Sequence, residues 1–155
     1  MHYRAYHPDD FSSLYSIEEI CFQRPIRFPR RYMKSLIDRS DSATWVAEEQ
    51  GIQAGFAIVD WDGSPPDRSA YIQTIEVAPD FRRRGIGAEL LNRVEESARS
   101  AGAAEIWLHV DVHNEPAIRL YQSSGYRLQG RQDHYYARHH PADLYAKQLY
   151  SSTRD

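Results

Sequence analysis

The sequence predicts a single domain of the α/β class, built on a mixed β-sheet and spanning residues 1–155. The chain has 155 residues, of which 41% are hydrophobic, and this is enough for one core of its own. Three consecutive strand patterns are joined only by turns, which is typical of an antiparallel meander. A strand, a long helix and another strand then follow one another, and such a crossover makes its two strands parallel.

The first 40 residues are expected to form one strand and two helices. Residues 2–6 have a strand pattern, and Asp9 or Asp10 can cap a helix that runs to about residue 20. The apolar stripe of that helix is expected to consist of Phe11, Leu14, Ile17 and Ile20. Residues 23–29 contain two prolines and are expected to be a loop. A second helix is expected over residues 30–38, with inward side chains Tyr32, Met33, Leu36 and Ile37.

The middle of the chain is expected to form the meander and the longest helix. Residues 43–48 and 53–61 predict a hairpin with Gly51 in its turn. Residues 62–67 are a surface loop rather than a domain linker, because the strand over residues 71–77 continues the same meander. A helix over residues 84–101 follows, with the buried face Ile86, Leu90, Leu91, Val94 and Ala98.

The last third of the chain is expected to add three strands and one short helix. Residues 105–110 predict a buried strand, and Asn114 is a good cap for a helix that runs to about residue 124. Residues 126–131 and 144–149 predict two strands that pair across a long loop. The expected order is therefore β-α-α-β-β-β-α-β-α-β-β.

Composition excludes several classes of function. The net charge is -3, so nothing overall indicates a nucleic-acid-binding protein. The single cysteine, Cys21, cannot form an internal disulfide, and this favours a reducing, cytoplasmic setting. Its apolar neighbours favour a buried, inert thiol over a nucleophile. We expect no signal peptide and no membrane-spanning segment, because no apolar run is long enough.

Residues 71–87 combine a strand, a basic glycine-containing loop and the start of a helix. Pro79 stops the strand, and the loop that follows is Arg82-Arg83-Arg84-Gly85-Ile86-Gly87. A helix N-terminus offers unpaired N–H groups and partial positive charge, and the glycines allow close approach, so this loop suits a pyrophosphate. Its spacing fits neither the Walker pattern nor the dinucleotide fingerprint. The alternative is a solvated basic turn that caps the helix.

Two motifs and the order of elements resemble the GNAT acetyltransferase superfamily. The loop matches the superfamily's Arg/Gln-x-x-Gly-x-Gly/Ala signature, and residues 110–126 resemble its second signature, in which an Asn precedes Ala-x-x-x-Tyr-x-x-x-Gly-Phe/Tyr. The resemblance implies a sheet with splayed central parallel strands and acetyl transfer from acetyl-CoA to an amine. The residues that it implies for binding the coenzyme are Ile75, Glu76, Val77, Arg82, Arg83, Arg84, Gly85, Ile86, Gly87, Asn114 and Tyr121. For Asn114, capping of its helix alone is the alternative.

The ends of the chain look like the subgroup that acetylates protein N-termini. Phe28-Pro29, and Tyr135-Tyr136 followed by Pro-Ala-Asp, resemble the bacterial ribosomal-protein alanine acetyltransferase RimI and the catalytic subunit of the NatE complex. The resemblance implies that Phe28, Pro29, Tyr135 and Tyr136 form the wall of a peptide-binding site. The alternative is an ordinary aromatic cluster that joins the first loop to the last.

The resemblance also implies catalytic roles. Tyr71 and His109 match positions with base function in NatE-like enzymes, and Tyr121 matches the tyrosine that protonates the departing thiolate. RimI-like enzymes carry a Glu where this chain has His109, which favours the NatE-like pattern. Glu76 is a competing base. The structural alternatives are a core histidine for His109 and packing roles for both tyrosines.

The acceptor amine must be neutral when it attacks the thioester. An α-amine with a pKa of about 7.7–8 is some 10–20% neutral at pH 7, whereas lysine is almost entirely charged. We therefore expect the N-terminus of a protein or peptide as acceptor, with a small-molecule amine or a lysine side chain as the alternative. A coenzyme A-binding regulatory module is the non-enzyme alternative, which the three catalytic candidates argue against.

No metal and no nucleic-acid or membrane partner is expected. His134, His139 and His140 fit no standard set of metal ligands. A monomer or a homodimer is expected.

Overall fold

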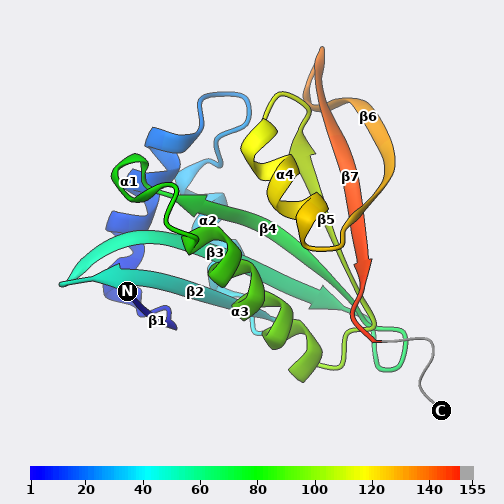
Figure 1. The fold of residues 1–155 in the computed structure, drawn as a ribbon, viewed down its shortest axis with the longest axis horizontal. Helices are drawn as coiled ribbons and strands as arrows, with labels where there is room; N and C mark the ends of the chain where they lie inside the picture. Colours follow the sequence, from blue (N-terminus) through cyan, green and yellow to red (C-terminus); the bar gives the residue numbers. More distant parts are fainter. Residues whose placement is uncertain (151–155) are drawn as a thin grey trace.

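The computed structural model describes residues 1–150 and contains one seven-stranded sheet with helices on both faces (Figure 1). The strands are β1 His2–Ala5, β2 Ser42–Glu49, β3 Ile52–Asp62, β4 Ser69–Val77, β5 Glu105–Asp111, β6 Arg127–Ala137 and β7 His140–Gln148. The helices are α1 Phe11–Cys21, α2 Arg30–Asp38, α3 Ile86–Ser100 and α4 Glu115–Ser123, with 3₁₀ turns over Pro8–Asp10 and Pro79–Phe81. The predicted class and the predicted order of elements are confirmed.

The central parallel strands are paired along only half of their length. The sheet order is β1-β2-β3-β4-β5-β7-β6, and β2, β3 and β4 form the predicted antiparallel meander. β4 and β5 pair only from Ser69↔Glu105 to Ile72↔Leu108. Beyond that point β4 continues along β3 while β5 continues along β7, and the two strands diverge (Figure 1). The second half of β4 therefore has a backbone edge that faces a gap in the sheet.

A β-bulge in β4 changes which side chains face which layer. Ile58 pairs with Thr74 and Val59 pairs with Ile72, so Gln73 is an extra residue on β4. Before the bulge Ile72 packs in the core beneath α3, and after it Ile75 packs against that same core. The side chains of Thr74 and Glu76 therefore turn to the face covered by α1, which is also the face of Tyr71.

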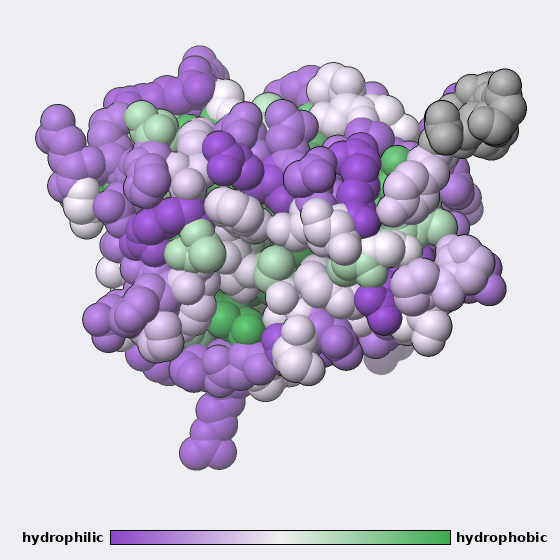
Figure 2. Space-filling model, turned by 90° about the horizontal axis from the view of Figure 1, so that it is seen from below, coloured by the Kyte–Doolittle hydropathy of each residue, from purple (hydrophilic) through white to green (hydrophobic). Residues whose placement is uncertain are grey.

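Two apolar cores lie on opposite faces of the sheet. One core joins the sheet to α3 and α4, and it contains every residue of the predicted buried face of α3. The other joins the sheet to α1 and α2 through Phe11, Leu14, Ile17, Met33, Leu36, Ile37, Val46, Phe56 and Ile58. The surface in Figure 2 is mainly hydrophilic, with apolar side chains in small separate patches. Within residues 1–150, every helix is too short or too polar to cross a bilayer.

Three local predictions are wrong. Ile20 is 63% exposed, because the last turn of α1 extends past the core and Glu18 is buried in its place. Tyr32 is 49% exposed, because it lies at the rim of α2 and faces the ring of Phe28. The side chain of Asp10 does not cap α1. It accepts hydrogen bonds from Arg4 and from the backbone N–H of His7 instead.

The predicted long loop between the last two strands is also wrong. β6 runs on to Ala137 and β7 begins at His140, so only a two-residue turn separates them. His139 has a φ of 63° in this turn. The pairing breaks between Gln132 and Ala137, and this irregular part of the hairpin carries Tyr135 and Tyr136. The strand continues past residue 131 because β6 pairs with β7 at Gln132 and again at Ala137.

Candidate active site

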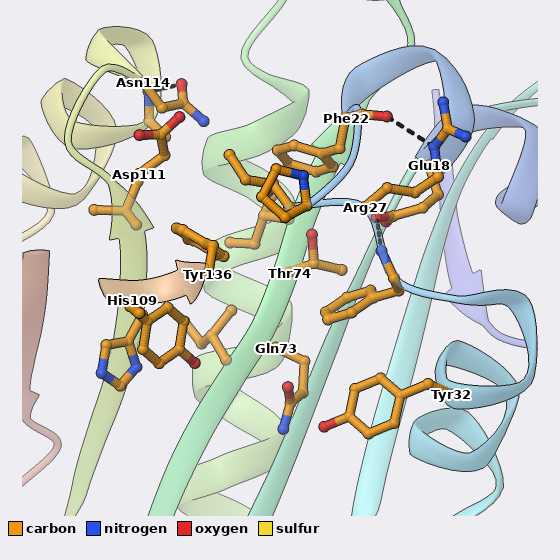
Figure 3. Close-up of a pocket in the computed structure, with 18 of the residues that line it drawn as sticks. Glu18, Phe22, Arg27, Tyr32, Gln73, Thr74, His109, Asp111, Asn114 and Tyr136 are labelled. Carbon is orange, nitrogen blue, oxygen red and sulfur yellow. Dashed lines mark hydrogen bonds between the residues drawn. The ribbon is translucent and has the colours of Figure 1, made fainter. Parts of the chain in front are cut away.

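A cavity of about 410 Å³ lies where β4 and β5 diverge. The α1–α2 loop forms one wall, and the β6–β7 hairpin together with α4 forms the other (Figure 3). The predicted site residues that line it are Phe28, Pro29, Tyr71, Ile75, His109, Asn114, Tyr121, Tyr135 and Tyr136. Residues from all three predicted groups, catalytic, coenzyme-binding and acceptor-binding, are therefore brought together in one cavity.

Tyr71 and His109 form a hydrogen-bonded pair across the two parallel strands. The Tyr71 hydroxyl lies 2.7 Å from Nδ1 of His109, and Nε2 of His109 is hydrogen-bonded to Oε1 of Gln132. An amide oxygen can only accept, so Nε2 carries the ring proton and Nδ1 accepts from Tyr71. The Tyr71 oxygen lies 3.1 Å from the Tyr135 hydroxyl, which is then free to donate to it. The pair is thus oriented so that a proton of Tyr71 points at a vacant lone pair of His109.

Burial shifts both groups in directions that suit proton transfer. Burial lowers the pKa of His109, and the hydrogen bond that its Nε2 donates to Gln132 opposes this in part. His109 is therefore neutral at pH 7. Burial, followed by the hydrogen bond with Tyr135, raises the pKa of Tyr71 well above its ordinary value. The Tyr135 ring stacks on the His109 ring at 4.0 Å between centroids, which covers one face of the imidazole.

Gln132 is a residue of this site that sequence reasoning missed. The sequence pattern predicts the end of β6 at residue 131, and nothing in the pattern singles out the next residue. Gln132 pairs with Ala142 of β7, and β7 lies between β6 and β5 in the sheet. Its side chain therefore reaches His109 across an intervening strand. The one local indication of where the Gln132 side chain points is the in–out alternation of β6, continued by one residue beyond the predicted end of the strand.

Tyr121 lies at the buried end of the cavity. It projects from α4, is 5% exposed and packs edge-on against Tyr126 at 5.6 Å. Burial raises the pKa of Tyr121, and the nearby Glu76 adds to the shift, so the phenol is protonated at neutral pH. Asn114 caps α4, since its Oδ1 accepts from the backbone N–H of Ala117 at 3.3 Å. Both residues line the cavity as well, so the capping and packing alternatives coexist with a place in the site.

The basic loop lies outside the cavity, at the N-terminus of α3. Arg83 has a φ of 65° and Gly85 a φ of 80°, so both lie in the left-handed region. Left-handed residues at such positions direct successive backbone N–H groups toward the same side of the loop. Within residues 1–150, no hydrogen bond is made by the backbone N–H groups of residues 83–88. A Cβ built on Gly85 meets no atom within 4 Å. The loop therefore presents open, unpaired donors and the positive end of a helix dipole.

The three residues at the end of β4 have different surroundings. Ile75 lines the cavity, while Val77 packs against the core beneath α3. The carbonyl oxygen of Val77 accepts from Nε of Arg82 at 3.0 Å, which ties the basic loop to the strand. The Glu76 side chain is 3% exposed and meets Glu18 of α1. Glu76 is not among the residues that line the cavity, which makes it a poorer candidate for the base than His109.

The wall opposite the catalytic pair is held by α1. The backbone N–H of Phe28 donates to Oε2 of Glu18 at 2.9 Å, and its carbonyl oxygen accepts from the Tyr15 hydroxyl at 2.7 Å. The Phe28 ring lies 5.6 Å from the ring of Tyr32. On the other wall, the Tyr135 and Tyr136 rings meet edge-on at 4.9 Å. Aromatic rings therefore face one another across the opening.

The histidines of the β6–β7 turn do not form a metal site in the described part of the chain. The rings of His134 and His139 meet edge-on, and Nδ1 of His134 accepts from the backbone N–H of His139 at 2.9 Å. Among residues 1–150, no three His, Cys, Asp or Glu side chains are grouped so that they could hold a metal ion.

Comparisons with known proteins find relatives both in sequence and in fold. Residues 11–126 match the model of the Acetyltransferase (GNAT) family. N-alpha-acetyltransferase 50 of Danio rerio is 29% identical over 142 residues, covering 91% of this chain and 83% of the relative.

Two solved structures share the fold. One is the ribosomal-protein-S18-alanine N-acetyltransferase of Escherichia coli, with a TM-score of 0.84, 23% identity, and coverage of 99% of this chain and 97% of that one. The other is NAA60 of Arabidopsis thaliana in complex with acetyl-CoA, with a TM-score of 0.82, 24% identity, and coverage of 95% and 97%.

Proposed function

Since the chain belongs to the acetyltransferase (GNAT) family, we propose that it transfers the acetyl group of acetyl-CoA to the N-terminal α-amine of a protein or peptide. The observation that carries the proposal is the Tyr71–His109 pair, held in a cavity between two aromatic walls. A relative named as an N-alpha-acetyltransferase and a solved neighbour named for the alanine of a ribosomal protein support this acceptor.

Acetyl-CoA is proposed to bind along the end of β4. The backbone edge of residues 73–77, left without a partner strand, would hydrogen-bond the amides of the pantetheine arm. The unpaired N–H groups that follow Arg82 would hold the pyrophosphate. Asn114 and Tyr121 would lie beside the arm on the α4 side. The binding residues are thus proposed to be those predicted from the motif, with Glu76 contributing its backbone only.

The proposed reaction is direct attack of the neutral amine on the thioester carbon. As the C–N bond forms, the amine passes its proton to the Tyr71 oxygen, and Tyr71 passes its own proton to Nδ1 of His109. The C–S bond breaks, and the Tyr121 hydroxyl gives its proton to the departing sulfur. Burial at this end of the cavity raises the pKa of a thiolate as it raises that of Tyr121, so the transfer is not opposed. Exchange with solvent restores both groups.

A chain end fits the cavity better than an internal side chain. The rings of Phe28 and Tyr135 line the same cavity from opposite walls, and a free N-terminus with one small or apolar side chain can pass between them. An α-amine also requires only a modest base, because about 10–20% of it is already neutral at pH 7. We propose further that the protein acts in a reducing compartment such as the cytoplasm, where Cys21 stays a thiol.

The test is acetyl-CoA turnover against short peptides that differ in their first two residues, with spermidine and free lysine as controls. We expect peptides with a free N-terminus to be acetylated and the same peptides with a blocked N-terminus to be inert. Activity on the amine controls alone would overturn the N-terminal acceptor and favour a small-molecule substrate. Binding of acetyl-CoA without turnover of any amine would favour a regulatory module.

A further inference from the structure

Two buried carboxyl groups meet between α1 and β4 at the wall of the cavity, which Glu18 lines. Glu18 and Glu76 are 1% and 3% exposed, respectively. Each has one satisfied oxygen: Oε2 of Glu18 accepts from the backbone N–H of Phe28 at 2.9 Å, and Oε2 of Glu76 accepts from the Thr74 hydroxyl at 2.8 Å. The other oxygen of each, Oε1, has no donor within residues 1–150. Each carboxyl group therefore has one buried oxygen that accepts no hydrogen bond from the described part of the chain.

A single proton shared by the two carboxyl groups satisfies both oxygens. Burial raises the pKa of Glu76 well above its ordinary value, and its hydrogen bond to Glu18 raises it further. Two like charges in contact inside an apolar layer cannot both ionise at neutral pH. In the described part of the chain, no lysine or arginine forms an ion pair with either group. The protonated form of the pair is therefore the form that this environment favours.

The other titratable groups around the pair do not supply a competing charge. Cys21 of α1 lies next to both glutamates, and burial raises the pKa of its thiol, so it is neutral. Tyr121 of α4 is also neutral. Arg82 is a cation on this side of the sheet, but its guanidinium donates to Sγ of Cys21 at 3.4 Å and to the carbonyl of Val77. The proton on the carboxyl pair is thus the group that decides the local charge.

We propose that the Glu18–Glu76 pair is a positioning device for the acceptor, in which one shared proton holds the α1–α2 loop against β4. The loop, residues 22–29, carries Phe28 into the wall of the cavity, and both backbone groups of Phe28 are bound by side chains of α1. Glu18 provides one of those bonds through Oε2, and in the proposed pair it shares a proton with Glu76. This inference rests on the proposed function only for the identity of the acceptor.

Loss of the shared proton would release this wall. Two adjacent carboxylates repel, so Glu18 and the loop that it holds would move away from β4. Because the folded state raises the pKa of Glu76, the contact is present at low pH and is lost as pH rises through that raised value. The pH is therefore varied widely, from about 5 to about 10, to cover the loss of this contact. Glu18 and Glu76 are therefore positioning residues.

The experiment uses Glu76→Gln, whose amide can donate to Oε1 of Glu18 at any pH. The readout is hydrogen exchange at the Phe28 amide, corrected for the intrinsic pH dependence, which needs no acceptor peptide. We expect the protection of Phe28 in the wild type to fall by about tenfold or more over this pH range. Protection in Glu76→Gln should stay constant. Glu19→Gln, which changes an exposed carboxyl on the same helix, is the matched control and should follow the wild type.

Parallel protection curves for the wild type and Glu76→Gln would overturn the proposal. If Glu76→Gln does not fold, Thr74→Val keeps the inference testable. The Thr74 hydroxyl lowers the pKa of Glu76, so its removal should move the wild-type transition to higher pH, and an unmoved transition would contradict us.

The acceptor KM separates this inference from the proposed function. The titration of the α-amine affects the wild type and Glu76→Gln equally, so the ratio of their KM values isolates the pair. We expect this ratio to rise at least fivefold with pH, while the ratio for acetyl-CoA stays flat. A flat acceptor ratio would overturn the positioning role and leave N-terminal acetylation intact. If the protection of the Phe28 amide depends on pH but the protein acetylates no peptide, the carboxyl pair still holds the loop and N-terminal acetylation is overturned.

Discussion

Replacement of His109 by alanine is the most direct test of the proposed proton transfer. The change removes Nδ1, which lies 2.7 Å from the Tyr71 hydroxyl, and with it the only acceptor to which that hydroxyl donates in the proposed scheme. Positioned general bases contribute about 10²–10⁴-fold to rate. Because the α-amine is already partly neutral, the base takes up only the proton released during attack, and we expect the lower end. The predicted loss is about 100-fold in kcat, or ~2.7 kcal/mol of transition-state stabilisation.

A second variant separates proton transfer from hydrogen bonding. In His109→Asn, Oδ1 lies near the former position of Nδ1 and can accept from Tyr71, but it cannot take up a proton. The assay is initial-rate release of free coenzyme A thiol at saturating acetyl-CoA and varied peptide. We expect both variants to be slow and to keep the KM for acetyl-CoA within about twofold, since His109 contacts Tyr71, Gln132 and Tyr135 but not the basic loop. A kcat for His109→Ala within about threefold of the wild type would remove His109 from the mechanism, and full activity of His109→Asn would reduce it to a positioning role.

Three further predictions concern the same site and the core behind it. The acid limb of kcat/KM, calculated on the concentration of neutral amine, should have its midpoint below about pH 6.5, because burial lowers the pKa of His109 and the enzyme loses its base only when the imidazole becomes charged; a corrected midpoint above about 7 in a pH–rate profile would contradict this. Gln132→Leu should lower kcat by about tenfold and move that limb to still lower pH, because it removes the bond that raises the His109 pKa, and an unmoved limb would exclude this orienting role. Lys147→Met should lower the free energy of unfolding by ~2 kcal/mol in urea titrations, because it leaves the buried Glu95 carboxylate with the Tyr126 hydroxyl and only a longer contact to Arg99, at 3.8 Å; an unchanged midpoint would show that the Lys147–Glu95 ion pair is not stabilising.

Elements with a strong local pattern could be predicted from the sequence. The predicted buried face of α3, Ile86 to Ala98, is wholly buried, because helical spacing alone places those side chains on one stripe. The caps of α4 follow equally local rules, with Asn114 at its start and Gly125, at a φ of 93°, after its end. The burial of Glu18 in place of Ile20 could not be predicted, because it depends on which partner α1 meets on β4.

The site could be predicted only in part. Tyr71, His109 and Tyr121 were identified because they sit in motifs of known spacing, and the structure places all three around one cavity. Gln132 and Glu18 carry no motif. Each reaches the site through a tertiary contact, Gln132 across a strand and Glu18 from the first helix to the fourth strand. Contacts of this kind depend on sheet order and helix placement, which single-residue patterns do not encode.

The bulge at Gln73 links the chemistry to the proposed positioning device. If Gln73 were paired regularly instead of forming a bulge, alternation would turn Glu76 into the aliphatic core beneath α3 and turn Ile75 toward α1. A carboxyl group in that core would have no partner, whereas on the α1 face it meets Glu18. The bulge also lies just where β4 leaves β5, so the backbone edge proposed for the pantetheine arm begins there. One inserted residue therefore allows a single strand to present Tyr71 to the acceptor, its free edge to acetyl-CoA and Glu76 to the helix that shapes the cavity wall.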